Sequence, residues 1–137
     1  MPESQRSRWL DLLRELGYHF FNGTPAFAQF ESPNQGGTPV DLMFVNSKTW
    51  ESLLAGSQSM ELAGENIQLP RPEHLISLKI HAAASPERSK PTQDWEDIRQ
   101  IVKVCKLDPR EASFREMILR YGGPAALEKI EKFADEN

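Results

Sequence analysis

The sequence predicts an α+β protein: a small mixed or antiparallel β-sheet of about three to four strands with flanking helices, followed by a C-terminal helical bundle. Short β-like runs separated by Gly- and Pro-containing loops fill residues 18–45, and apolar residues recur at helical spacing from Pro72 onward. A chain of 137 residues with 39% hydrophobic content is long enough for one compact domain. We therefore expect a single domain, 1–137, with an α/β part over 1–70 and a helical part over 71–137.

The first half opens with a predicted helix over Ser4–Leu16, whose apolar residues have helical spacing and which Gly17 ends. A second helix begins near Asn46 or Ser47, either of which can cap it, and ends by Gly56. The strands are predicted at Tyr18–Phe21, Ala26–Glu31, Val40–Val45 and Asn66–Leu69. The second and third of these runs suit a hairpin with a long loop.

The second half is predicted to be helical throughout. One helix runs from Pro72 to about Ser85 and another from Thr92 to Lys106. A third begins at Asp108, an acidic N-cap followed by proline at the first helical position, and Gly122-Gly123 ends it before a last helix starts at Pro124. Cys105 continues the apolar stripe of its helix, so we expect it in the core.

Lys79 falls at the centre of the apolar arc of its predicted helix. An ammonium that faces a core must find a carboxylate, reach a wet cleft or lose its proton. The next helix opens with Asp94, inside its apolar stripe, and with Asp97, at the edge of that stripe. One interpretation is a structural ion pair of Lys79 with Asp94 and Asp97. The other is a cleft in which Lys79 and Arg88, from the following loop, hold phosphate.

Asp41 is the second candidate residue. In the run VDLMFV the strand period of two places Asp41 on one face with Met43 and Val45, so a carboxylate stands beside apolar neighbours. One interpretation is a half-solvated strand entrance after a Gly/Pro loop, and the other is a metal-facing carboxylate. A single aspartate does not make a two-metal phosphoryl-transfer site, which needs several converging carboxylates.

The composition limits the partners and the compartment. Lys and Arg number 16 against 20 Asp and Glu, a net charge of -4, which argues against broad attraction to nucleic acid or to anionic membranes. The single cysteine excludes a disulfide framework within the chain, and a reducing cytoplasm is the simplest setting. No signal-peptide pattern or apolar run of about 18 residues is present, so we expect a cytoplasmic protein without a membrane span.

The order of these motifs resembles the later part of small nucleotidyltransferase-fold proteins, which include the abortive-infection (Abi-type) toxin nucleotidyltransferases. The matching features are a helix ending in LGY, the strand VDLMF, the helix PEHLISLKIHAA, Arg88 and the run DWEDI. The resemblance extends from about Leu10 to Lys106 and is most specific between Glu73 and Ile98. It implies a partial nucleotidyltransferase-like fold and a setting in toxin–antitoxin systems or phage defence.

In that family a glycine turn and a strand with two alternating acids bind nucleotide phosphates and divalent metal, and a third acid comes from a later strand. By position, Asp41 resembles the third acid. The resemblance then implies catalytic roles for Asp41 and Lys79, a Mg²⁺ ligand in Asp41, and phosphate contacts from Lys79 and Arg88. This sequence departs from the pattern before Asp41, because no acidic pair follows Gly23-Thr24, and Gly36-Gly37 leads straight to Asp41.

Three hypotheses follow from this comparison. The first is a catalytically incomplete nucleotidyltransferase-like protein that acts as a binding or regulatory component. The second is an active Mg²⁺-dependent nucleotidyltransferase whose site is completed by an oligomer or an upstream-encoded partner chain, with a nucleoside triphosphate as substrate and a tRNA or protein acceptor. The third is a structural homodimerisation module, because missing strands leave sheet edges and apolar faces that need cover.

Overall fold

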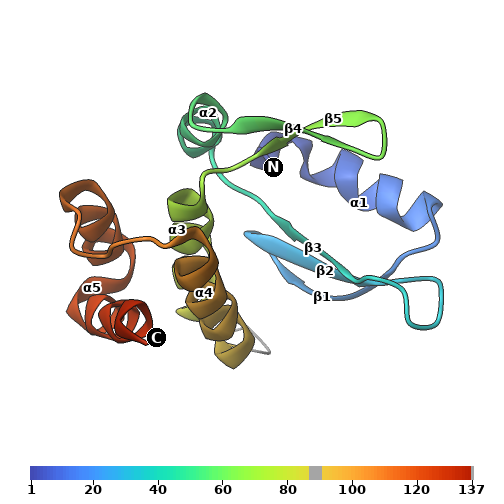
Figure 1. Cartoon of the computed structure of the whole chain (residues 1–137). Helices are drawn as coiled ribbons and strands as arrows, with labels where there is room; N and C mark the ends of the chain where they lie inside the picture. The colour runs from blue at the N-terminus through green and yellow to red at the C-terminus, as the bar shows by residue number, and fades with distance from the viewer. Residues whose placement is uncertain (87–90, 137) are drawn as a thin grey trace. The chain divides into compact units, whose positions relative to one another are not determined.

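The computed structural model describes residues 1–86 and 91–136 and divides into two compact units, Met1–Ala55 and Gly56–Asn137 (Figure 1). The α+β class is confirmed, and the strands form two separate antiparallel sheets, ordered β1-β2-β3 and β4-β5, in the described residues. None of the described helices is long and apolar enough to cross a membrane.

The first unit contains a three-stranded sheet with a helix packed on one face. Its elements are a 3₁₀ turn at Glu3–Gln5, α1 (Arg6–Glu15), β1 (His19–Thr24), β2 (Phe27–Glu31), β3 (Val40–Met43) and α2 (Ser47–Ala55). Asn46 caps α2, as predicted, because its side-chain oxygen accepts from the Thr49 amide at 2.9 Å.

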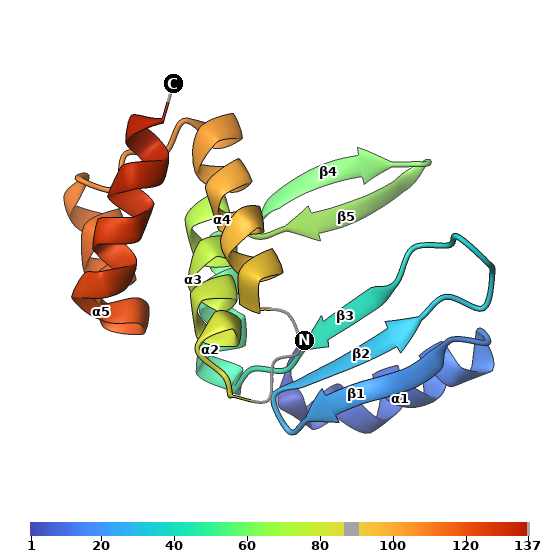
Figure 2. The ribbon, with the colours of Figure 1, turned by 90° about the horizontal axis from the view of Figure 1, so that it is seen from below.

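One face of this sheet carries the core of the first unit. Phe30 pairs with Val40 across β2 and β3, and Ala28 pairs with Leu42, so that their side chains lie on the same face. Figure 2 shows α1 lying along the sheet, and the buried Leu10 and Leu13 of that helix complete the cluster. The opposite face of the sheet is therefore the one that carries Asp41 and Gln29.

The second unit consists of a β-hairpin and helices. Its elements are β4 (Gln58–Leu62), β5 (Glu65–Leu69), α3 (Pro72–Ala83), α4 (Pro91–Cys105) and α5 (Ala112–Asp135). The helices share one apolar core of buried residues: Ile76, Ile80, Ile98, Val102, Phe114, Ile118, Ala126, Leu127 and Ile130. Predicted helical periodicity and observed burial agree here, since Ile76 and Ile80, and Ile98 and Val102, are spaced four residues apart.

The start of α5 and the end of α4 differ from the prediction in ways that change which residues are buried. α5 begins at Ala112 and not at Asp108, because the Asp108 side chain accepts from the Arg110 amide two residues on, a turn contact that competes with helix capping. Cys105 is exposed, so the prediction that it lies in the core was wrong. The reason is that α4 ends at this residue. Lys106 turns with φ 52°, and Leu107 donates back to Val102 and packs on the core in place of Cys105.

The pair Gly122-Gly123 divides α5 into two helical segments, as the sequence predicts. Gly123 has φ 70° and ψ -172°, a conformation that is open to glycine and strained for other residues. Pro124 follows at the start of the second segment, where a missing amide hydrogen costs little.

The strand β4 was not predicted. Its sequence, QSMEL, has two apolar residues among polar ones and gives a weak strand signal. The turn that joins it to β5 consists of Ala63 (φ 53°) and Gly64 (φ 83°), and this pair of positive φ values is the geometry of a two-residue hairpin turn.

Candidate functional site

The first candidate site is the ion pair between α3 and α4. The Lys79 Nζ lies 2.6 Å from Asp97 Oδ2 and 3.6 Å from Asp94 Oδ1. The Asp94 side chain is 1% exposed, that of Lys79 is 22% exposed and that of Asp97 is 36% exposed. Lys79 thus lies against the two aspartates that the helical pattern offered as partners, and Asp94 is the deeper of the two.

The position of Asp94 follows from its place in α4. It lies in the first turn, four residues before the fully buried Ile98, so the same face that buries Ile98 carries the carboxylate inward. Free amide hydrogens at a helix N-terminus favour a negative charge there. The ammonium of Lys79 supplies the opposite charge from the neighbouring helix.

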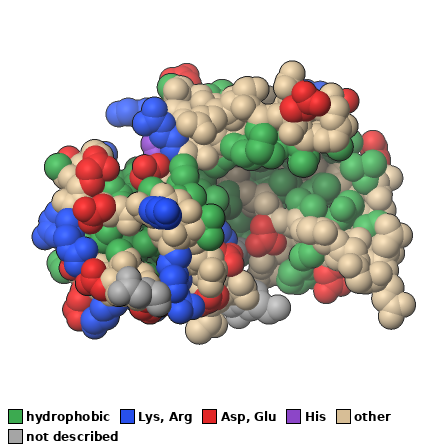
Figure 3. Space-filling view, viewed as in Figure 1, with side chains coloured by type: hydrophobic (Ala, Val, Ile, Leu, Met, Phe, Trp, Pro, Cys, Tyr) green, Lys and Arg blue, Asp and Glu red, His purple; other side chains and the backbone are tan. Residues whose placement is uncertain are grey.

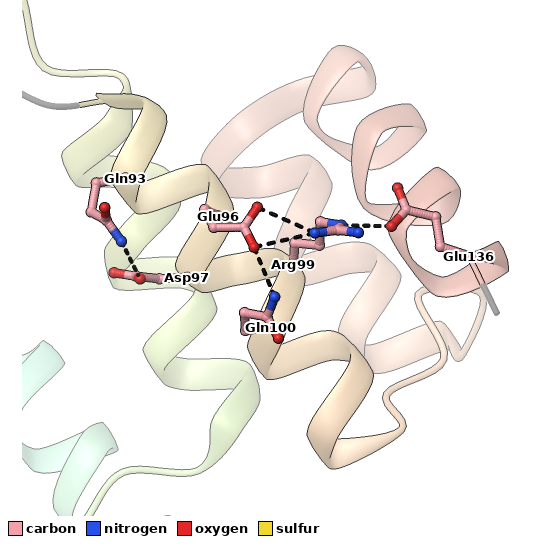
Figure 4. Close-up of polar contacts among 6 residues, drawn as sticks. All are labelled: Gln93, Glu96, Asp97, Arg99, Gln100 and Glu136. Carbon is pink, nitrogen blue, oxygen red and sulfur yellow. Dashed lines mark hydrogen bonds and ion pairs between the residues drawn. The ribbon is translucent and has the colours of Figure 1, made fainter.

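The charge balance of this cluster bears on its chemistry. Two carboxylates face the ammonium of Lys79, one at 2.6 Å and one at 3.6 Å. Gln93 also donates to Asp97, at 2.9 Å, and the bond is drawn in Figure 4. A phosphate would therefore have to displace two carboxylates to reach the lysine, and the arrangement suits a structural pair better than an anion site. Arg88, the other predicted phosphate contact, lies outside the described residues.

The second candidate site is a row of polar side chains across the three strands of the first unit. Asn22 pairs with Gln29, and Gln29 pairs with Asp41, in the register of the sheet. The Gln29 amide nitrogen lies 3.2 and 3.1 Å from the two carboxylate oxygens of Asp41, and Asn22 donates to Gln29 Oε1 at 2.9 Å. We call Asn22, Gln29 and Asp41 the polar row.

Burial makes the middle of the polar row rigid. Gln29 is 8% exposed, whereas Asp41 is an exposed residue. The Gln29 side-chain oxygen accepts from Asn22, and its nitrogen donates to Asp41. Both contacts require the same orientation of the Gln29 amide. A buried, oriented amide thus donates to an exposed carboxylate at the surface of the sheet. The sequence singled out Asp41, but it gave no sign of Gln29 or Asn22.

The donor set does not fit the metal centre that the resemblance implies. Among the described residues, no three His, Cys, Asp or Glu side chains gather closely enough to hold a metal ion. Asp41 contributes one carboxylate, and the Gln29 amide donates to both of its oxygens. Two-metal phosphoryl transfer needs several carboxylates around the ions.

A third polar cluster lies on the surface of the second unit. Arg99 in α4 bonds Glu96 in the same helix and Glu136 just after α5 (Figure 4). The hydrogen bond from Gln100 and the charge of Arg99 hold the pKa of Glu96 below its ordinary value. Glu96, Gln100 and Glu136 are exposed and Arg99 is half-buried, so the cluster joins α4 to the end of α5 in a solvated setting.

Asp41 lies in the first unit and Lys79 in the second, so the two predicted catalytic residues belong to separately packed parts of the chain. A scan of the sequence against models of protein families gave no match, and a search of curated proteins gave none either.

Proposed function

We propose that the chain is a nucleotidyltransferase-like protein that acts as a binding or regulatory component and does not transfer nucleotides by itself. The observation that carries the proposal is the polar row, in which a buried amide orients one exposed carboxylate. Such a row offers hydrogen-bond acceptors and amide groups, the side chains that pair with the edges of nucleobases. We propose a nucleoside triphosphate as the ligand and the reducing cytoplasm as the compartment.

The state of Lys79 supports the binding role over catalysis. Its ammonium is already compensated by Asp94 and Asp97, so it adds no net positive charge to attract a triphosphate. The single carboxylate at Asp41 leaves the charge of the phosphates largely unheld within the described residues. An active enzyme would need further acids and cations from a partner chain, which is the alternative proposal.

The test is a calorimetric titration of the purified chain with each of the four nucleoside triphosphates, with and without Mg²⁺. We expect binding of at least one nucleotide, and we expect Asp41→Asn to weaken it about tenfold or more, because a hydrogen bond to a charged group contributes about 1.5–3 kcal/mol. Asp11→Asn is the matched control, since Asp11 is an exposed carboxylate of the same unit, paired with Arg14 in α1. That variant should bind like the parent chain.

A transfer assay on the same preparations separates the two proposals. We expect no incorporation of labelled nucleotide into tRNA or protein acceptors. Transfer by the chain alone that Asp41→Ala abolishes would overturn the regulatory role and establish the enzyme. Equal nucleotide affinity of the parent chain and Asp41→Asn would remove the polar row as the binding site.

A further inference from the structure

The β4–β5 hairpin ends in two open edges. Within the described residues, β4 and β5 pair with each other and with no third strand. Both strands are exposed along almost their whole length, and only Ile67 is half-buried. A two-stranded hairpin is marginally stable by itself, and its unpaired backbone groups are a template for a further strand.

The base of the hairpin is anchored to its own unit. The Arg71 side chain donates to the Gly56 carbonyl at 3.1 Å, just before β4, and Ser57 donates to Gln68 at 2.9 Å. These two bonds close the base of the hairpin, and the Ala63-Gly64 turn lies at its far end. A partner strand would meet an edge that is already paired on its other side.

The two faces of the hairpin differ in character. Met60 pairs with Ile67 and Leu62 with Glu65, and the register places Leu69 on the same face. Met60 is 43% exposed, Leu62 is 56% exposed and Leu69 is 38% exposed. Apolar side chains are exposed on the face of the molecule drawn in the space-filling view (Figure 3). The opposite face carries the polar residues Ser59, Glu61, Asn66 and Gln68.

The two-residue turn also determines which backbone groups point outward. In such a hairpin the pair beside the turn, Leu62 and Glu65, exchanges both hydrogen bonds, and bonded and non-bonded pairs then alternate. Ile67 therefore directs its amide and carbonyl toward β4. Asn66 and Gln68 direct theirs to the open edge of β5, and Ser59 and Glu61 direct theirs to the open edge of β4.

We infer that the open edge of β5 pairs antiparallel with β5 of a second copy of this chain, centred on Ile67, to give a four-stranded sheet. In this register Ile67 faces Ile67 of the second copy, and Asn66 and Gln68 exchange backbone hydrogen bonds with Gln68 and Asn66. The apolar face of the hairpin would then continue from one copy to the other through the side chains of Ile67 and Leu69. This inference does not depend on the proposed nucleotide-binding role.

Charge distinguishes the two edges. Pairing through β5 places Glu65 opposite Leu69 of the second copy, with the two glutamates at opposite ends of the joint. Pairing through β4, centred on Met60, would place Glu61 opposite Ser59 and diagonal to the second Glu61, so two carboxylates would lie near the centre. Neither strand carries the proline or lysine that commonly protects an edge.

The experiment is hydrogen exchange of the full chain at rising concentration, together with analytical ultracentrifugation. An interface of five residues on each side is small, so we expect a weak dimer that forms between about 5 and about 500 µM. Over that range the amides of Asn66 and Gln68 should exchange more slowly, while those of Ser59 and Glu61 should stay unchanged. Ile67→Lys places two ammonium groups face to face at the centre and should leave a monomer.

Met60→Lys is the matched control, because Met60 is the cross-strand neighbour of Ile67 on the same face. It should keep the dimer, and both variants should give the circular dichroism of the parent chain. A monomer at every concentration would overturn the inference, and so would protection of Ser59 and Glu61 in place of Asn66 and Gln68. Loss of the dimer in both variants without amide protection would also overturn it, because that result indicates face-to-face packing.

Discussion

Asp94→Asn is expected to lower the free energy of unfolding by about 3 kcal/mol, although the amide has nearly the same shape as the carboxylate. The substitution leaves the Lys79 ammonium, 22% exposed, without the carboxylate that lies buried beside it. Removing the buried partner costs more than the pair contributes, because Lys79 then keeps only Asp97, whose side chain is 36% exposed. Urea unfolding followed by circular dichroism measures the change.

Asp97→Asn is the internal control for this prediction. Its oxygen lies closer to Lys79, at 2.6 Å, yet its side chain is 36% exposed, and we expect a loss of about 1 kcal/mol or less. A larger loss of stability for Asp94→Asn than for Asp97→Asn would show that burial of the carboxylate matters more than its distance from Lys79. A larger loss at Asp97 than at Asp94, or full stability of Lys79→Met, would contradict the structural role of this ion pair.

Gly122→Ala is expected to destabilise the second unit by about 2–3 kcal/mol, even though alanine is the better helix former. A Cβ at this position would lie 2.4 Å from the Ala126 Cβ and 2.7 Å from the Ile80 Cγ2. Ile80 is 2% exposed and Ala126 is 5% exposed, so neither has open space to move into. The cost comes from overpacking at the contact between α3 and α5.

A second substitution shows whether this mechanism is right. Ala126→Gly removes the methyl group at 2.4 Å, so Gly122→Ala should cost clearly less in that background than in the parent chain. The urea midpoints of the four proteins provide the comparison. Strict additivity of the two substitutions would contradict the steric explanation, as would wild-type stability of Gly122→Ala.

The helices of the second unit illustrate what a local pattern can predict. Spacings of three and four residues located α3 and α4 closely, and the same periodicity placed Asp94 inside the buried arc and Asp97 at its edge. The pattern failed where a helix ends. In the sequence, Cys105 continues the apolar stripe of α4. In the structure, the backbone turns at Lys106, and Leu107 packs on the core instead. Periodicity describes a helix only as far as that helix continues.

The β part was harder to predict, because the contacts that stabilise a strand come from elsewhere in the chain. β4 has a weak strand signal of its own and depends on the register with β5. The polar row has the same origin. Asn22, Gln29 and Asp41 are separated by 7 and 12 positions, and they meet because each faces the same side of its strand.

The sequence by itself determined the α+β class, most helices and the need of Lys79 for a carboxylate, because each depends on residues within one or two turns of a helix. Only the tertiary structure decided that Gln29 holds Asp41, that Gly122 accommodates Ile80 and that the β5 edge is open. Strand pairing and helix contacts join distant residues, and a shift of one residue in register would move every strand side chain to the opposite face.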